Sequence, residues 1–169
     1  PDDEFISITG SPYDTLQKVI GIQGDQEGTL MDYGIKYKEV PLNKGKIDVE
    51  EVLKSISDNT KLLLIQRSTG YSDRKAITID EMEEAIKKIK SEKENIIIMI
   101  DNCYGEFLEE REPTDIGADI MAGSLIKNPG GGLALAGGYI VGKSNLVEQV
   151  ANRSTAPGLG KDCGLSFGT

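Results

Sequence analysis

Two side chains stand out for the chemistry they could do, and each follows an apolar run. Asp101 ends the run 96–100 (IIIMI), where a carboxylate needs a cation or hydrogen-bond donors nearby. Lys127 lies between the apolar-rich segment 120–126 and the glycines at 130–132. A lysine that such surroundings desolvate can lose its proton and attack a carbonyl carbon to form a Schiff base.

These two residue types are the pair that pyridoxal phosphate (PLP) requires. The cofactor's aldehyde needs a lysine, and its pyridine nitrogen needs an acid that keeps it protonated, a role that suits Asp101. Ser124, three residues before the lysine, could offer its hydroxyl and backbone to the phosphate. Each residue also has an ordinary structural interpretation, Asp101 as a turn or capping aspartate and Lys127 as a surface lysine lying along apolar groups.

The segment 137–144 (GGYIVGKS) supports a competing interpretation. Its letters match the phosphate-binding loop G-x-x-x-x-G-K-S, which would make the protein a P-loop NTPase. However, Tyr139-Ile140-Val141 is apolar and partly β-branched, which is typical of a strand and not of a flexible loop with inward-facing amides. We therefore keep the NTPase as a remote alternative.

Composition narrows the function classes further. The 169 residues carry 19 basic and 28 acidic side chains, a net charge of −9, so neither nucleic acid nor an anionic membrane is an expected partner. The absence of histidine excludes the Ser-His-Asp and Cys-His types of catalysis and histidine metal sites. Cys103 and Cys163 form no CxxC pair and the acidic residues are scattered, so we expect no metal site. Two distant cysteines also imply no disulfide framework, so we expect a cytoplasmic, reducing location.

Apolar runs alternate with helical patterns along the whole chain. Strands are predicted over 5–8, 35–40, 61–65, 96–101, 119–122 and 138–141. Helices are predicted from a Ser11 cap to Gly21, from Asp48 to about Ile56, from a Thr78/Glu81 capping box to about Ile89, and over 145–152 behind a Ser144 cap, with a loop-like tail over 154–160.

This alternation predicts an α/β domain with a doubly wound, mostly parallel sheet and helices on both faces. The unbroken apolar run before Asp101 is typical of a strand covered on both sides. In such a sheet, ligands bind outside the carboxyl ends of the strands. The residues that follow the predicted strands are therefore the site candidates, and they include Tyr13, Gln66 and Tyr104.

Taken together, Tyr13, the block 101–106 (DNCYGE) and the block 123–132 (GSLIKNPGGG) resemble fold-type-I PLP enzymes of the cystathionine and methionine lyase group. The closest likeness is to the aluminium-resistance, or methionine γ-lyase-like, subgroup. The likeness extends over essentially the whole chain, and the aspartate and Ser-x-x-Lys blocks at this spacing are specific.

The resemblance implies a role for each candidate residue. Lys127 would form the internal aldimine, Asp101 would bind the pyridinium nitrogen, and Ser124 would bind the phosphate. Tyr13 would stack on the cofactor ring. Gln66 or Tyr104 could reach the ring oxygen, although core packing is an equal alternative for Tyr104.

The sequence departs from the family pattern in two places. Many relatives have Ser-x-Thr-Lys, whereas Ile126 stands in place of the threonine here and removes one phosphate hydroxyl. The segment 66–68 (QRS) is unlike the family's usual one. Family members have about 400 residues, so we expect residues 1–169 to be the central part of the PLP-binding large domain. The N-terminal segment, the C-terminal small domain and the arginine that binds the substrate carboxylate are expected to lie outside the chain. Arg153 is not assigned the role of that arginine.

The implied function is a PLP-dependent carbon–sulfur lyase for a small sulfur-containing amino acid of the cystathionine or methionine type. A fragment of this length is expected to be inactive alone, and the full-length protein is expected to be a homodimer or homotetramer. Two alternatives keep the fold: a PLP-dependent aminotransferase, and a catalytically silent protein of stress or metal tolerance.

Overall fold

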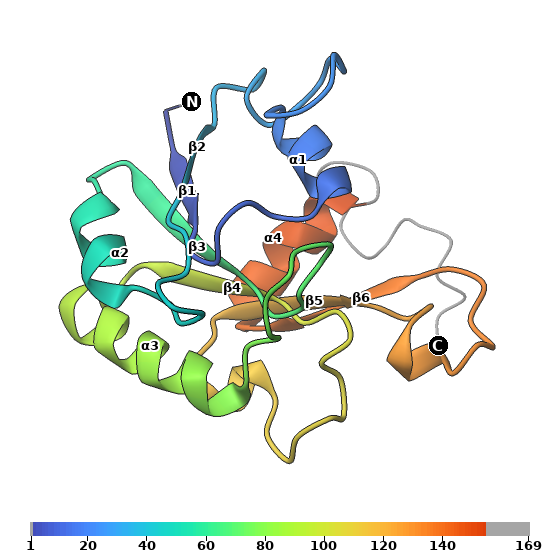
Figure 1. The fold of residues 1–169 in the computed structure, drawn as a ribbon. Coiled ribbons are helices and arrows are strands. Elements are labelled where there is room, and N and C mark those ends of the chain that lie inside the picture. Colours follow the sequence, from blue (N-terminus) through green and yellow to red (C-terminus); the bar gives the residue numbers. More distant parts are fainter. Residues whose placement is uncertain (1, 155–169) are drawn as a thin grey trace.

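The computed structural model describes residues 2–154, which form one six-stranded sheet with four α-helices and two short 3₁₀ segments (Figure 1). The strands are β1 (Glu4–Ser7), β2 (Lys36–Glu39), β3 (Thr60–Gln66), β4 (Ile97–Asp101), β5 (Ile120–Ser124) and β6 (Gly138–Gly142). The helices are α1 (Asp14–Ile20), α2 (Val49–Ser55), α3 (Ile79–Glu92) and α4 (Ser144–Ser154), with 3₁₀ segments η1 (Pro113–Ile116) and η2 (Asn128–Gly130).

The strand order is β2-β1-β3-β4-β5-β6. All neighbouring pairs are parallel except β5 and β6, which are antiparallel. The chain goes outward from β1 to β2 and then crosses back to β3 on the other side of β1. The point between β1 and β3 is therefore the topological switch point, where α/β sheets of this kind bind ligands. The predicted α/β class, with its mostly parallel sheet, is confirmed.

Three helix boundaries follow from local capping. Thr78 and Glu81 form the predicted capping box at the start of α3, and the Asp48 side chain accepts the Glu51 N–H at the start of α2. Gly21 ends α1 in the left-handed conformation, with φ of 102°.

The predicted starts of the other two helices are wrong. Tyr13, and not Ser11, is the N-cap of α1. The Tyr13 N–H donates to Oε1 of Gln66 on β3, and the helix begins at the next residue, Asp14. At α4, the Lys143 carbonyl accepts from Leu146 and Val147 N–H, so helical bonding starts one residue before Ser144. Residues 155–160 of the predicted tail lie outside the described part of the chain, and Ser154 belongs to α4.

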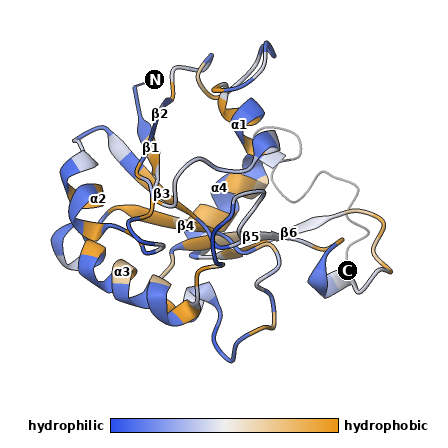
Figure 2. Ribbon diagram, in the orientation of Figure 1, coloured by the Kyte–Doolittle hydropathy of each residue, from blue (hydrophilic) through white to orange (hydrophobic). Residues whose placement is uncertain are grey.

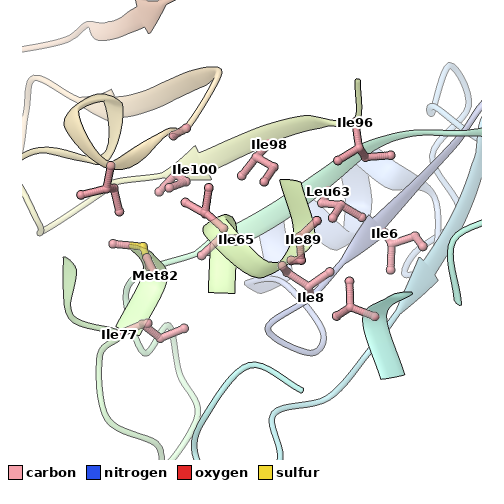
Figure 3. Close-up of a cluster of buried hydrophobic side chains, with 14 of the residues drawn as sticks. Ile6, Ile8, Leu63, Ile65, Ile77, Met82, Ile89, Ile96, Ile98 and Ile100 are labelled. Carbon is pink, nitrogen blue, oxygen red and sulfur yellow. The ribbon is translucent and has the colours of Figure 1, made fainter. Parts of the chain in front are cut away.

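The core fills the space between one face of the sheet and the helices α2 and α3 (Figure 1). Residues of β1, β3 and β4 face this side, among them Ile6, Leu63 and Ile98, and Figure 2 shows β3 and β4 as largely orange, hydrophobic strands. Figure 3 shows how they meet the helices, with Ile65 and Ile98 of the sheet near Met82 and Ile89 of α3. All four side chains are fully buried, each worth about 1.5–3 kcal/mol on folding.

The opposite face carries α4. Ala122 and Ile140, from the paired strands β5 and β6, line a shared surface with Val147 and Val150 of this helix. Helices therefore lie on both faces, as predicted. The P-loop interpretation is wrong, because 138–142 is a strand paired along its whole length with β5 and not a loop. None of the described helices combines the length and the apolar character that a membrane crossing needs.

Candidate active site

Lys127 lies three residues after the end of β5, at the N-cap of η2. Its Nζ atom is 4.3 Å from the centre of the Tyr104 ring, a cation–π contact. Burial alone would lower the pKa of Lys127, but a hydrogen bond with Cys103 and the charges of Tyr104 and Asp101 outweigh it and hold that pKa above its ordinary value. The lysine predicted from the sequence is therefore surrounded by the loop that follows β4.

Asp101 is the last residue of β4, and it lies opposite Gln66 of β3 and Ala122 of β5 in the sheet. Its Oδ1 accepts the Cys103 N–H at 3.0 Å. Burial, followed by the charge of Asp101 and a hydrogen bond to it, raises the pKa of the Cys103 thiol. Asp101, Cys103 and Lys127 thus form one electrostatically coupled group.

Cys103 is the member of this group that the sequence reasoning missed. In the sequence, Cys103 only follows Asp101 by two positions, which does not indicate a hydrogen bond between its thiol and Lys127. The described acidic residues and Cys103 form no cluster that could hold a metal ion.

Tyr13 and Gln66 meet at the switch point of the sheet. The Tyr13 N–H donates to Gln66 Oε1 at 2.8 Å, and Gln66 Nε2 donates to the Ser68 carbonyl at 3.3 Å. Burial and the nearby charges of Asp101 and Cys103 raise the pKa of the Tyr13 hydroxyl. Tyr13 therefore belongs to the same group as Asp101, whereas Gln66 is 4% exposed and fixes the backbone of Tyr13 in place.

The remaining two candidates differ in how they are placed. Tyr104 contacts Lys127 and is 55% exposed, so the alternative that it is a core packing residue is wrong. Its backbone adopts φ of 68°, a strained conformation for a side chain of this size. Ser124 ends β5 opposite Gly138, and its hydroxyl has no hydrogen bond to another residue of the described region.

A buried arginine holds the loop after β4 in shape. Arg67 is 4% exposed, and it donates to Asn102 Oδ1 at 2.8 Å and to the Gly105 carbonyl at 2.9 Å. It also pairs with Glu109. Gly105 is required here, because a Cβ at this position would collide with the guanidinium and lie 2.6 Å from Asn102 Oδ1. In the sequence, Arg67 stands out only as part of the segment 66–68, which departs from the family pattern.

The arrangement fits PLP on three counts. A lysine amine and a carboxylate lie near each other at the carboxyl ends of adjacent strands, an aromatic ring lies beside them, and Ser124 precedes the lysine with a hydroxyl that no residue within 2–154 binds. Schiff-base chemistry needs the amine and the acid together. The sheet order and these strand-end residues define a domain of the PLP-dependent transferase fold.

Comparison with known proteins gives the family. The family model for methionine gamma-lyase matches residues 1–169, and the chain belongs to this family. The chain is similar to the solved structure of a candidate cystathionine beta-lyase involved in aluminum resistance from Clostridium acetobutylicum, with 53% identity, a TM-score of 0.94, and coverage of 99% of this chain and 41% of that one. The corresponding protein from Listeria monocytogenes has 49% identity and a TM-score of 0.93, and the match covers 97% and 41% of the two chains.

Curated relatives extend the comparison. Uncharacterized protein YnbB of Bacillus subtilis is 51% identical over 169 residues, which are 99% of this chain and 40% of that protein. The chain therefore spans about two fifths of the length of these relatives. Histidinol-phosphate aminotransferase 2 of Bacillus cereus is 27% identical over 128 residues, 69% of this chain and 32% of that protein.

Proposed function

We propose that the full-length protein is a PLP-dependent carbon–sulfur lyase that acts on a sulfur-containing amino acid of the cystathionine or methionine type. The observation that carries the proposal is the meeting of Lys127, Asp101 and Tyr13 at the carboxyl ends of the central strands. The names of the Clostridium and Listeria relatives support the reaction class.

In this proposal Lys127 binds the cofactor aldehyde through its amine. The structure holds Lys127 with a raised pKa, so it must first lose a proton to become a nucleophile. The Lys127 amine would also be the base that takes the α-proton of the amino acid.

Asp101 holds the proton on the ring nitrogen, and bound PLP then supplies an electron sink that lets a thiol group leave from the β- or γ-carbon. The Cys103 N–H orients this carboxylate through its bond to Oδ1. Tyr13 would stack on the cofactor ring, Ser124 would donate to the phosphate, and Gln66 or Tyr104 would bind the ring oxygen.

The decisive experiment uses the full-length protein. With PLP it should show a visible absorbance band that borohydride removes, and the Lys127→Ala variant should be colourless. Lys88→Ala, an exposed lysine of α3 paired with Glu84, is the matched control and should keep the band. Covalent PLP retained in Lys127→Ala would overturn the assignment, and a wild type without the band would favour a catalytically silent protein on this fold.

An aminotransferase is the second candidate, because histidinol-phosphate aminotransferase 2 of Bacillus cereus is similar over 128 residues. The two reactions release different products. A lyase turns a sulfur amino acid into a thiol, ammonia and a keto acid, whereas an aminotransferase needs a keto-acid acceptor and releases no ammonia. Measuring ammonia with and without an added keto acid separates the two.

The proposal includes a homodimer or homotetramer as the working form of the full-length protein. Sedimentation velocity of that protein at several concentrations tests this directly. A single species of monomer mass throughout would reject it.

A further inference from the structure

A buried carboxyl group lies next to the candidate site and takes no part in the chemistry proposed above. Glu106 is 4% exposed, and its Oε1 accepts the Tyr139 hydroxyl at 3.0 Å. Its other oxygen, Oε2, is buried without any hydrogen-bond partner among residues 2–154. Burying a carboxyl group costs several kcal/mol unless donors compensate it, so the side chain depends on Tyr139.

The Tyr139 hydroxyl also connects to the residue beside Asp101. Asn102, which is fully buried, donates from Nδ2 to this hydroxyl at 3.3 Å and to Glu112 Oε2 at 2.9 Å. Tyr139 therefore contacts both ends of the segment 102–106. That segment contains Cys103 and Tyr104, the two side chains that surround Lys127.

Tyr139 itself belongs to the other half of the site. It lies on β6 directly opposite Gly123 of β5, and the connection between these strands carries Lys127. Gly123 has no side chain to obstruct the contact: a Cβ there would collide with the tyrosine hydroxyl and lie 2.5 Å from Glu106 Oε1. The tyrosine therefore joins the lysine-bearing hairpin to the loop after Asp101.

The loop that Tyr139 holds is strained. Tyr104 and Phe107, on either side of Glu106, have φ of 68° and 60°, which side chains of this size rarely adopt. Such conformations persist only where surrounding contacts impose them. A second link between the two halves, from Asn128 Nδ2 to the Tyr104 carbonyl at 3.1 Å, is exposed to solvent and is expected to be the weaker one.

We propose that Tyr139 is a positioning residue: its hydroxyl, held by Glu106 and Asn102, fixes the distance between Lys127 and Asp101 that the cofactor must match. This inference rests on the proposed function, since it assigns the two residues to opposite ends of the PLP ring. Removing the hydroxyl would leave Glu106 with no donor among the described residues and release the strained loop.

The test compares Tyr139→Phe with Tyr37→Phe in the full-length protein. Tyr37 donates its hydroxyl to Glu39 at 2.7 Å on the edge strand β2, so this control removes a tyrosine–carboxylate hydrogen bond that touches neither the Lys127 hairpin nor the segment 102–108. Amide hydrogen exchange of residues 102–108 should be about tenfold faster in Tyr139→Phe and unchanged in Tyr37→Phe. The dissociation constant of PLP should rise about tenfold in Tyr139→Phe alone.

The outcomes are separable. Unchanged exchange of 102–108 in Tyr139→Phe would overturn the link itself, and this readout needs no cofactor. Faster exchange with unchanged PLP affinity and absorbance maximum would show a purely structural role and overturn the positioning. A wild type that binds no PLP would instead reject the proposed function.

If Tyr139→Phe does not fold, Glu106→Gln provides the second measurement, because it keeps the acceptor oxygen but removes the charge. Glu106→Gln should also speed amide exchange of residues 102–108 and raise the dissociation constant of PLP, each by less than tenfold. No change in either quantity would count against the proposal. If both single variants fold, the effects in the double variant should be less than additive, since both residues act through one bond.

Discussion

At the scale of single residues, the loop after β4 is shaped by contacts that leave no spare volume. Gly105→Ala should destabilise the protein by about 1–3 kcal/mol, because its new Cβ would meet the Arg67 guanidinium and Asn102 Oδ1. Denaturant unfolding measures this. A cost below about 0.5 kcal/mol, the range of an ordinary surface substitution, would show that the loop can adjust.

The reactivity of Cys103 is a second property of single residues. Burial and the Asp101 charge raise its thiol pKa, so alkylation at Cys103 should be slow at neutral pH and speed up only as the pH rises toward that pKa. Asp101→Asn removes the negative charge, which should lower the pKa and speed alkylation severalfold at pH 8. Peptide mass spectrometry reads out Cys103 specifically. Identical pH profiles for the two proteins would contradict the coupling.

At the scale of elements, one aspartate joins α3, β4 and the start of α4 at the amino end of the sheet. Asp119, 3% exposed, accepts from Lys90 at 2.7 Å, Lys143 at 2.6 Å and the Ile98 N–H at 2.8 Å. Burial alone would raise its pKa, but these three hydrogen bonds together hold it below the ordinary value. Asp119→Asn should cost about 3 kcal/mol at pH 7, because it leaves the lysines unpaired.

The pH dependence follows from the direction of that shift. A lowered folded-state pKa contributes stability above the unfolded value of about 3.9 and loses it as the pH falls through the folded pKa. The difference in unfolding free energy between wild type and Asp119→Asn should therefore be constant from pH 5 to 7 and shrink below about pH 4. Asp80→Asn, whose side chain is 86% exposed in its pair with Arg111, should show almost no difference at any pH.

At the scale of the whole molecule, burial is concentrated in the middle of the sheet. Strand β3 has two neighbours and four consecutive buried residues from Leu63 to Gln66, whereas β2 is an edge strand without a fully buried residue. Amides of β3 should therefore exchange at least a hundredfold more slowly than those of β2 in the full-length protein. Equal protection would mean that another part of the protein covers the β2 edge.

Much of the fold could be predicted because its signals are local. Apolar runs, and for β2 the alternation of apolar and polar residues over 35–40, indicated all six strands, and the Thr78/Glu81 box and Asp48 indicated where α3 and α2 begin. The rule that ligands bind at the carboxyl ends of strands then selected Asp101 and Lys127 without any coordinates. The start of α1 could not be predicted, since Gln66, distant in sequence, binds the Tyr13 N–H and shortens the helix.

The sequence by itself determined the class of elements, their order and the chemistry of the candidate residues, because side-chain periodicity and residue type are properties of short segments. Only the tertiary structure decided the strand order, the antiparallel direction of β6 and the surroundings of Lys127. The contacts of Cys103 with Lys127 and of Tyr139 with Glu106 join segments far apart in the chain. Such contacts depend on how strands are placed beside one another, which no local pattern encodes.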